Sequence, residues 1–172
     1  MSDTIVNKVA QSGLITLDLE QWLPPASDMV ALDISPFLFK GLLLKEKEFR
    51  AAVKAHDWQQ YDGKYVAVHC STKAIVAHWA YMLIASQLEP HVQGQGFGTI
   101  HDLETQLLIQ QIEHLDADHY GNERVIIKGC GDRKVSVAIY QAITAKLQPV
   151  VKTLMYGEPC STVPIYKKPR KK

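Results

Sequence analysis

Short apolar runs alternate with longer amphipathic segments along most of the chain. Residues 14–19 and 30–34 show the alternation of apolar and polar positions that is typical of strands. Residues 43–56 follow, with apolar positions at helical spacing and charged residues between them. The N-terminal third, residues 1–60, is therefore predicted to contain two strands and one helix.

A more regular alternation begins at residue 61. The pattern predicts strands at 65–69, 97–100 and 124–128, and helices at 75–88, 103–115 and 135–147. Prolines follow the first and third of these helices, where they prevent a further helical turn. Strands that alternate with helices of this length imply right-handed crossovers and a parallel sheet.

We therefore expect a single α/β domain over residues 1–166. Its sheet is predicted to be mostly parallel or mixed, with helices on both faces and βα units of the Rossmann or flavodoxin kind. Residues 1–60 add N-terminal strands and a helix, residues 61–150 hold the repeating βα units, and residues 151–166 form a C-terminal turn and strand. Residues 167–172 are a basic tail.

Two of the βα units match when the chain is shifted by 59 positions without a gap. The shift superposes Val66 on Val125 and Tyr81 on Tyr140, and it also aligns the prolines that end the two helices. Any βα unit needs apolar residues at such places, whereas the matched tyrosines and prolines extend the likeness further. The sequence leaves open whether the units arose by duplication.

Composition narrows the function classes. The net charge is +1 and apolar residues make up 47% of the chain, so no global field directs the protein to nucleic acid or to a membrane. No apolar run approaches the roughly 18 residues of a membrane helix. Three cysteines, an odd number far apart in sequence, do not form a disulfide framework. We expect a cytoplasmic protein with no nucleic-acid or membrane partner, and a homodimer as the default assembly.

Candidate chemistry lies where the predicted strands end. In an open parallel sheet ligands bind at the carboxyl ends of the strands. Cys70, His101 and Cys130 follow three predicted strands, and Cys160 lies in a predicted turn. Cys70 and Cys130 are also predicted to lie just before helix N-termini, where the helix dipole lowers the pKa of a thiol.

These positions predict a metal site formed by Cys70, Cys130 and Cys160, with Asp132 or His101 as a further ligand. Thiolates with an imidazole would suit zinc, iron or an iron–sulfur cluster. Two alternatives remain open: a single thiol could carry sulfur as in a rhodanese, or the cysteines could simply pack as small apolar residues. The glycine-rich segment 93–98 is predicted to precede a strand rather than follow one, which excludes a dinucleotide loop.

Several segments resemble a family of uncharacterised bacterial proteins, a domain of unknown function. They are residues 57–58 with 61, 79–83, 128–130 and 157–164, and the resemblance runs nearly end to end, including residues 6–8 and 12–14. The segment 157–164 (GEPCSTVP) is the most specific of them, and His101 does not belong to the family pattern. The family has no established activity, so the resemblance assigns no catalytic role. It implies a context, because such proteins are often encoded beside sulfur-mobilisation and iron–sulfur assembly components.

The leading hypothesis is an accessory factor of iron–sulfur or metal homeostasis that binds metal or sulfur through its cysteines, with iron–sulfur assembly proteins as partners. The first alternative is a protein-interaction module whose cysteines are structural. The second is a single-thiol sulfur-transfer enzyme. The sequence does not decide whether the protein is an enzyme.

Overall fold

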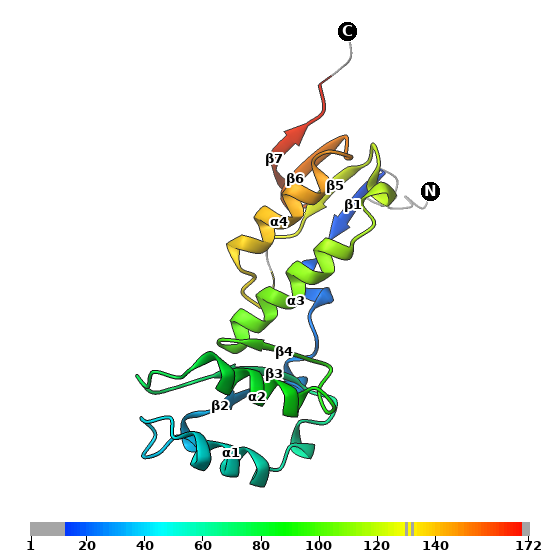
Figure 1. Cartoon of the computed structure of the whole chain (residues 1–172). Coiled ribbons are helices and arrows are strands. Elements are labelled where there is room, and N and C mark those ends of the chain that lie inside the picture. Colours follow the sequence, from blue (N-terminus) through cyan, green and yellow to red (C-terminus); the bar gives the residue numbers. More distant parts are fainter. Residues whose placement is uncertain (1–12, 130, 132, 170–172) are drawn as a thin grey trace, which may run out of the picture. The chain divides into compact units, whose positions relative to one another are not determined.

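The computed structural model describes residues 13–129, 131 and 133–169, and its contacts divide the chain into two compact units (Figure 1). Unit 2 is contiguous and comprises Pro24–Gln106. Unit 1 comprises Met1–Leu23 and Leu107–Lys172, so the chain of unit 2 is inserted within that of unit 1.

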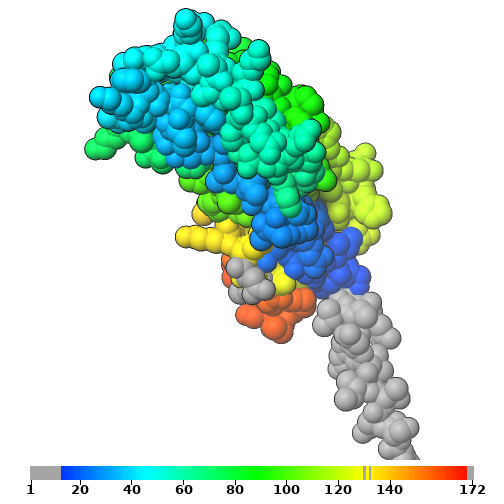
Figure 2. All heavy atoms as spheres, turned by 90° about the horizontal axis from the view of Figure 1, so that it is seen from below, coloured from blue at the N-terminus to red at the C-terminus, as the bar shows by residue number. Residues whose placement is uncertain are grey.

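Unit 2 has a three-stranded parallel sheet in the order β2-β3-β4. Its elements in chain order are β2 (Met29–Asp33), α1 (Glu46–Ala55), β3 (Tyr65–His69), α2 (His78–Leu88) and β4 (Gly94–Phe97). Two connections, β2 to α1 and β3 to α2, leave the carboxyl ends of neighbouring strands. The light blue to cyan atoms that include the first of them form a projecting edge of unit 2 (Figure 2).

The core of unit 2 lies between its sheet and the helices α1 and α2. Phe49 and Val53 are one helical turn apart on α1, so both face Val66 and Val68 of β3, and all four are buried. Trp58, which follows α1, is also buried, and its indole N–H donates to the carbonyl of Val53 at 2.9 Å. This bond satisfies a polar group that burial would otherwise leave without a partner.

The glycine-rich segment 93–98 forms β4 itself, so the expected strand at 97–100 is displaced. A Cβ at Gly96 would overlap the side chain of Gln106, and it would lie 3.0 Å from that of Leu103. Both residues belong to α3 (Ile100–His114), whose first turns therefore pack directly against the strand. Glycine makes this close approach possible, and its low strand propensity hid the strand from the hydrophobic pattern.

Unit 1 has a four-stranded sheet in the order β1-β5-β6-β7. Its strands are β1 (Leu14–Leu17), β5 (Arg124–Ile127), β6 (Thr153–Glu158) and β7 (Ser161–Lys167), and its helices are the second part of α3 and α4 (Val137–Leu147). The first three strands are parallel, and β7 returns antiparallel to β6. Buried residues of α3 and α4, such as Leu108 and Ile143, pack with Val125 and Leu154 of the sheet.

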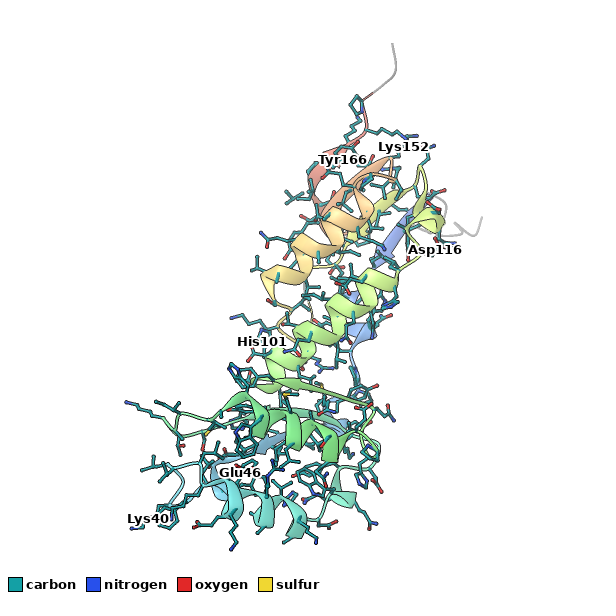
Figure 3. The ribbon with its side chains drawn as sticks, viewed as in Figure 1. Lys40, Glu46, His101, Asp116, Lys152 and Tyr166 are labelled. Carbon is teal, nitrogen blue, oxygen red and sulfur yellow. The ribbon has the colours of Figure 1, made fainter. Side chains whose placement is uncertain are left out.

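The two units repeat one β-α-β-α-β arrangement, which confirms the match at a shift of 59 positions and extends it. Each unit pairs its first strand with its second, and its second with its third, in parallel and in equivalent register. The turn before the second strand is also repeated: Asp57 accepts from the amide of Gln59, and Asp116 (labelled in Figure 3) accepts from that of Asp118. Such detailed agreement favours duplication of an ancestral unit.

The predicted α/β class with mostly parallel strands is confirmed. The strands form two sheets, because the two N-terminal strands, β1 and β2, each begin a separate sheet. Residues 151–166, expected to form a turn and a strand, contribute to two strands, β6 and β7, which pair in antiparallel orientation. The boundaries of the single domain expected over residues 1–166 stay a prediction. Within the part of the chain that the structure describes, no helix has both the length and the apolar character needed to cross a membrane.

Candidate functional site

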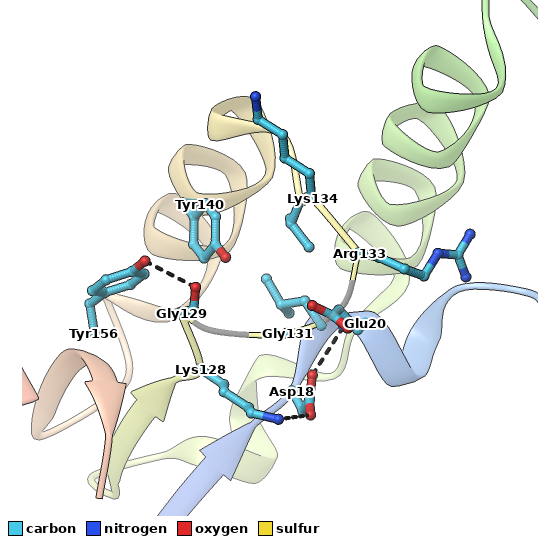
Figure 4. Close-up of a pocket in the computed structure, with 11 residues that line it drawn as sticks. Asp18, Glu20, Lys128, Gly129, Gly131, Arg133, Lys134, Tyr140 and Tyr156 are labelled. Atoms are coloured by element: carbon cyan, nitrogen blue, oxygen red, sulfur yellow. Dashed lines mark hydrogen bonds and ion pairs between the residues drawn. The ribbon is translucent and has the colours of Figure 1, made fainter. Parts of the chain in front are cut away.

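A cavity of about 460 Å³ opens in unit 1 at the carboxyl ends of β1 and β5 and beside the start of α4. Figure 4 shows side chains from the loops after these strands on one side of it and two tyrosines on the other. The lining residues are Asp18, Leu19, Glu20, Lys128, Gly129, Gly131, Arg133, Lys134, Val135, Tyr140 and Tyr156. The volume is within the range of pockets that hold small molecules.

An ion pair forms the floor of the cavity. The ammonium group of Lys128 lies 2.8 Å from a carboxylate oxygen of Asp18, and the other carboxylate oxygen accepts from the amide of Glu20 at 3.2 Å. The hydrogen bond from Lys128 to Asp18 and the charge of Asp18 raise the pKa of Lys128, and the carboxylates of Glu158 and Glu20 add to this effect. Lys128 is therefore a fixed cation at neutral pH.

Two glycines let the loop after β5 approach its neighbours. A Cβ at Gly131 would overlap the carboxylate of Glu20, and one at Gly129 would overlap the ring of Tyr156. The Tyr156 hydroxyl instead donates to the carbonyl of Gly129 at 3.3 Å. A side chain at either position would displace a residue that lines the cavity.

Arg133 and Lys134 bring two further cations to the mouth of the cavity, just before α4. Arg133 is half-buried and Lys134 is exposed. Ser136 caps the helix, since its hydroxyl accepts from the amide of Ala138 at 3.4 Å. The positive end of the helix dipole adds to the field of these side chains.

The equivalent place in unit 2 has a different chemistry. Asp33 is the last residue of β2, and it corresponds in register to Asp18, which directly follows β1. Its carboxylate accepts four hydrogen bonds, from the amide and hydroxyl groups of Ser35 and Ser71, at 2.6–3.0 Å. Partial burial by itself raises the pKa of Asp33, but these bonds outweigh it and hold the pKa well below its usual value. Residues of unit 2 itself thus supply hydrogen bonds to both carboxylate oxygens of Asp33.

Residues 3–168 match the protein family described as "Protein of unknown function (DUF2480)". The chain belongs to this family. The match confirms the resemblance to a domain of unknown function, while the bacterial origin and the iron–sulfur gene context stay predictions. No curated protein and no solved structure matches the DUF2480 chain.

The structure places the predicted site residues of the DUF2480 chain in different elements. Cys70 follows β3 and is half-buried, with its sulfur 3.4 Å from the hydroxyl oxygen of Thr72. Cys160 is exposed in the turn between β6 and β7. His101 is in the first turn of α3, and its Nδ1 lies 3.5 Å from a carboxylate oxygen of Glu104.

Cys130 and Asp132 lie outside the described residues, so the predicted metal site stays a prediction. Among the residues that are described, no group of three His, Cys, Asp or Glu side chains could hold a metal ion. The expectation that Cys70 lies just before a helix N-terminus is wrong, because α2 begins only at His78. The hydroxyl of Thr72 donates to the carbonyl of Gly41 at 2.7 Å and does not cap a helix.

The cavity of the DUF2480 chain opens at strand ends, where the sequence predicted a site, but most of its lining residues are neither thiols nor imidazoles. Asp18 directly follows β1 and Lys128 directly follows β5. A carboxylate and an ammonium group at neighbouring strand ends are a recognisable signal for a paired polar site. Tyr140 and Tyr156 were harder to find, because their lining role depends on how α4 packs against β6.

Proposed function

We propose that the protein binds a small anionic metabolite in the cavity of unit 1. One observation carries the proposal: two copies of the same fold differ at the same strand ends. In unit 2 the carboxylate of Asp33 accepts hydrogen bonds from Ser35 and Ser71. In unit 1 the position of Ser35 is occupied by Glu20, and a cavity lined partly by cationic residues lies at these strand ends.

The cavity offers an anion charge-assisted hydrogen bonds from Arg133 and Lys134 at the start of α4. In unit 2 the residues at these positions are Ala74 and Ile75, which cannot bind an anion. Guanidinium and ammonium donors suit phosphate and carboxylate groups. The ion pair of Lys128 with Asp18 supplies further polar contacts, and Tyr140 supplies an aromatic wall for the rest of the ligand.

The test is an NMR titration of the whole protein with inorganic phosphate, citrate and adenosine monophosphate. We expect shifts of the amides of Gly129 and Gly131, and at least about a tenfold loss of affinity in the double variant Arg133→Ala/Lys134→Ala, since two charged donors are removed. The amides of residues 69–77 in unit 2 provide an internal control and should not shift. Absence of shifts with all three probes, or equal affinity in the double variant, would refute the proposal.

A second candidate is metal or sulfur binding through Cys70, Cys130 and Cys160, as an accessory factor of iron–sulfur or metal homeostasis. It is favoured by the sequence position of two predicted ligands. Cys130 and Asp132 alternate along the chain with Gly129, Gly131 and Arg133, which line the cavity. Thiolates are ligands for zinc and iron.

Metal analysis of protein purified without oxygen tests this second candidate. We expect near-stoichiometric zinc or iron in the native protein and none in the triple variant in which Cys70, Cys130 and Cys160 are changed to serine. Serine keeps the size of the side chain and removes the thiolate. Metal-free native protein, or the same metal content in the triple variant, would exclude this candidate.

A further inference from the structure

Two neighbouring connections of unit 2 expose large apolar side chains. Leu42 and Leu43 in the β2–α1 connection are 62% and 55% exposed, and Ile75 in the β3–α2 connection is 93% exposed. The connections are joined, because the hydroxyl of Thr72 donates to the carbonyl of Gly41 at 2.7 Å. We call Phe39–Leu43 together with Lys73–Ile75 the tip.

The local backbone holds the leucines of the tip outward. The amide of Phe39 donates to the carbonyl of Leu43 at 2.9 Å, and the amide of Leu43 donates back to the carbonyl of Phe39 at 3.1 Å. Lys40 and Gly41 both have positive φ, 51° and 71°, which closes this tight turn. The exposure of the leucines thus follows from a defined turn and not from a loose loop.

Each of the two stretches that form the tip also contains a lysine. Lys40 lies in the middle of the β2–α1 connection, at the outer turn of this loop (Figure 3), and Lys73 lies in the other connection. Neither pairs with a carboxylate among the described residues. Residues 34–45 and 70–88 contain no aspartate or glutamate. The tip is therefore locally cationic, although the chain as a whole carries a net charge of only +1.

We propose that the tip docks unit 2 on an anionic membrane surface. Aliphatic side chains on a projecting turn can enter the boundary between headgroups and acyl chains, while lysines beside them contact anionic lipids. A second copy of the chain fits this surface less well, because a symmetric contact would bring Lys40 and Lys73 toward their own copies without carboxylates between them. Such a surface changes neither the net charge of the chain nor the length of its apolar runs, and the sequence-based expectation of no membrane partner rested on those two properties.

Vesicle flotation tests this docking. The full chain is mixed with phosphatidylcholine vesicles, with or without phosphatidylserine, at low and at high salt. We expect the protein to float with the anionic vesicles at low salt and to be released by salt, because the lysine contribution is screened. Changing Lys40 and Lys73 to glutamine should lower the partition coefficient about fivefold for each lysine.

The double variant Leu42→Glu/Leu43→Glu should abolish flotation. Its matched control is Val163→Glu/Ile165→Glu on β7, where the side chains are 58% and 52% exposed, and this variant should float like the native protein. Circular dichroism checks that both variants are folded. The proposal is overturned if the native protein floats with neither kind of vesicle, or if both double variants float equally. It is also overturned if the native protein sediments as a dimer and the leucine variant as a monomer.

Discussion

The variant Ile143→Ala is expected to lose about 3 kcal/mol of the free energy of unfolding of unit 1, within the range of about 2–5 kcal/mol for such truncations. Ile143 is fully buried on α4 and packs with Val125 and Leu154 of the sheet. Removing its side chain beyond Cβ leaves a cavity that the surrounding strands cannot fill without strain. Urea unfolding measures the loss, and hydrogen exchange of the β5 amides locates it.

Ile84 provides the matched variant in unit 2. It occupies the equivalent position on α2 and is also fully buried. Ile84→Ala should therefore cost about as much as Ile143→Ala, with the loss of amide protection in β3. The exposed residue Val137 of α4 serves as a control, and its change to alanine should have little effect. A loss below about 1 kcal/mol in both isoleucine variants would contradict the packing described for the two cores.

Asp33→Asn is expected to cost about 1–2 kcal/mol at neutral pH, a figure that allows for partial solvent exposure of the carboxylate. The aspartate accepts from the hydroxyl and amide groups of both Ser35 and Ser71, and an amide side chain cannot accept all four bonds. Urea unfolding of the variant, alone and combined with Ser71→Ala, measures how much of the loss depends on that serine. Additive losses would show that the two residues do not act together.

The same interaction makes the stability of unit 2 depend on pH. The pKa of Asp33 is lower in the folded protein than in the unfolded chain. The ionised Asp33 therefore contributes fully to the stability of unit 2 above the pKa of about 4 that an aspartate has in the unfolded chain. This contribution is lost as the pH falls from that value toward the lower pKa of the folded protein. The difference between native protein and Asp33→Asn should shrink over that interval. Asp28, whose pKa is lowered chiefly by a hydrogen bond from the half-buried Lys64, is the control, and Asp28→Asn should change stability much less.

The helices were predictable because their apolar positions recur with helical spacing. Strands such as β3 and β5 were predictable because they are short, continuous apolar runs. The strand β4 was not, because its glycines serve the close approach of α3, a tertiary contact that no local pattern contains. The repeat was visible in the sequence, and strands were predicted at residues 14–19 and 30–34. These strands were not assigned to the two copies, because β1 and β2 are consecutive in the chain although they belong to different sheets.

The candidate site shows a similar division. The rule that ligands bind at strand ends indicated the edge of the sheet at which the cavity opens, where Asp18 and Lys128 lie. The sequence could not show that, at the equivalent edge of unit 2, Ser35 and Ser71 donate hydrogen bonds to the carboxylate of Asp33. The contrast between the copies depends on side-chain geometry, and it gives the cavity of unit 1 its functional interest.

The insertion of one unit within the chain of the other has a consequence for synthesis. Unit 2 is a contiguous segment, so all its strands are present while the C-terminal part of the protein is still being made on the ribosome. Leu14 of β1, in contrast, pairs with Arg124 of β5, so this pairing cannot form until more than half of the chain has been synthesised. We expect unit 2 to fold first during translation, and the open edge of β1 to be the segment that chaperones protect until β5 emerges.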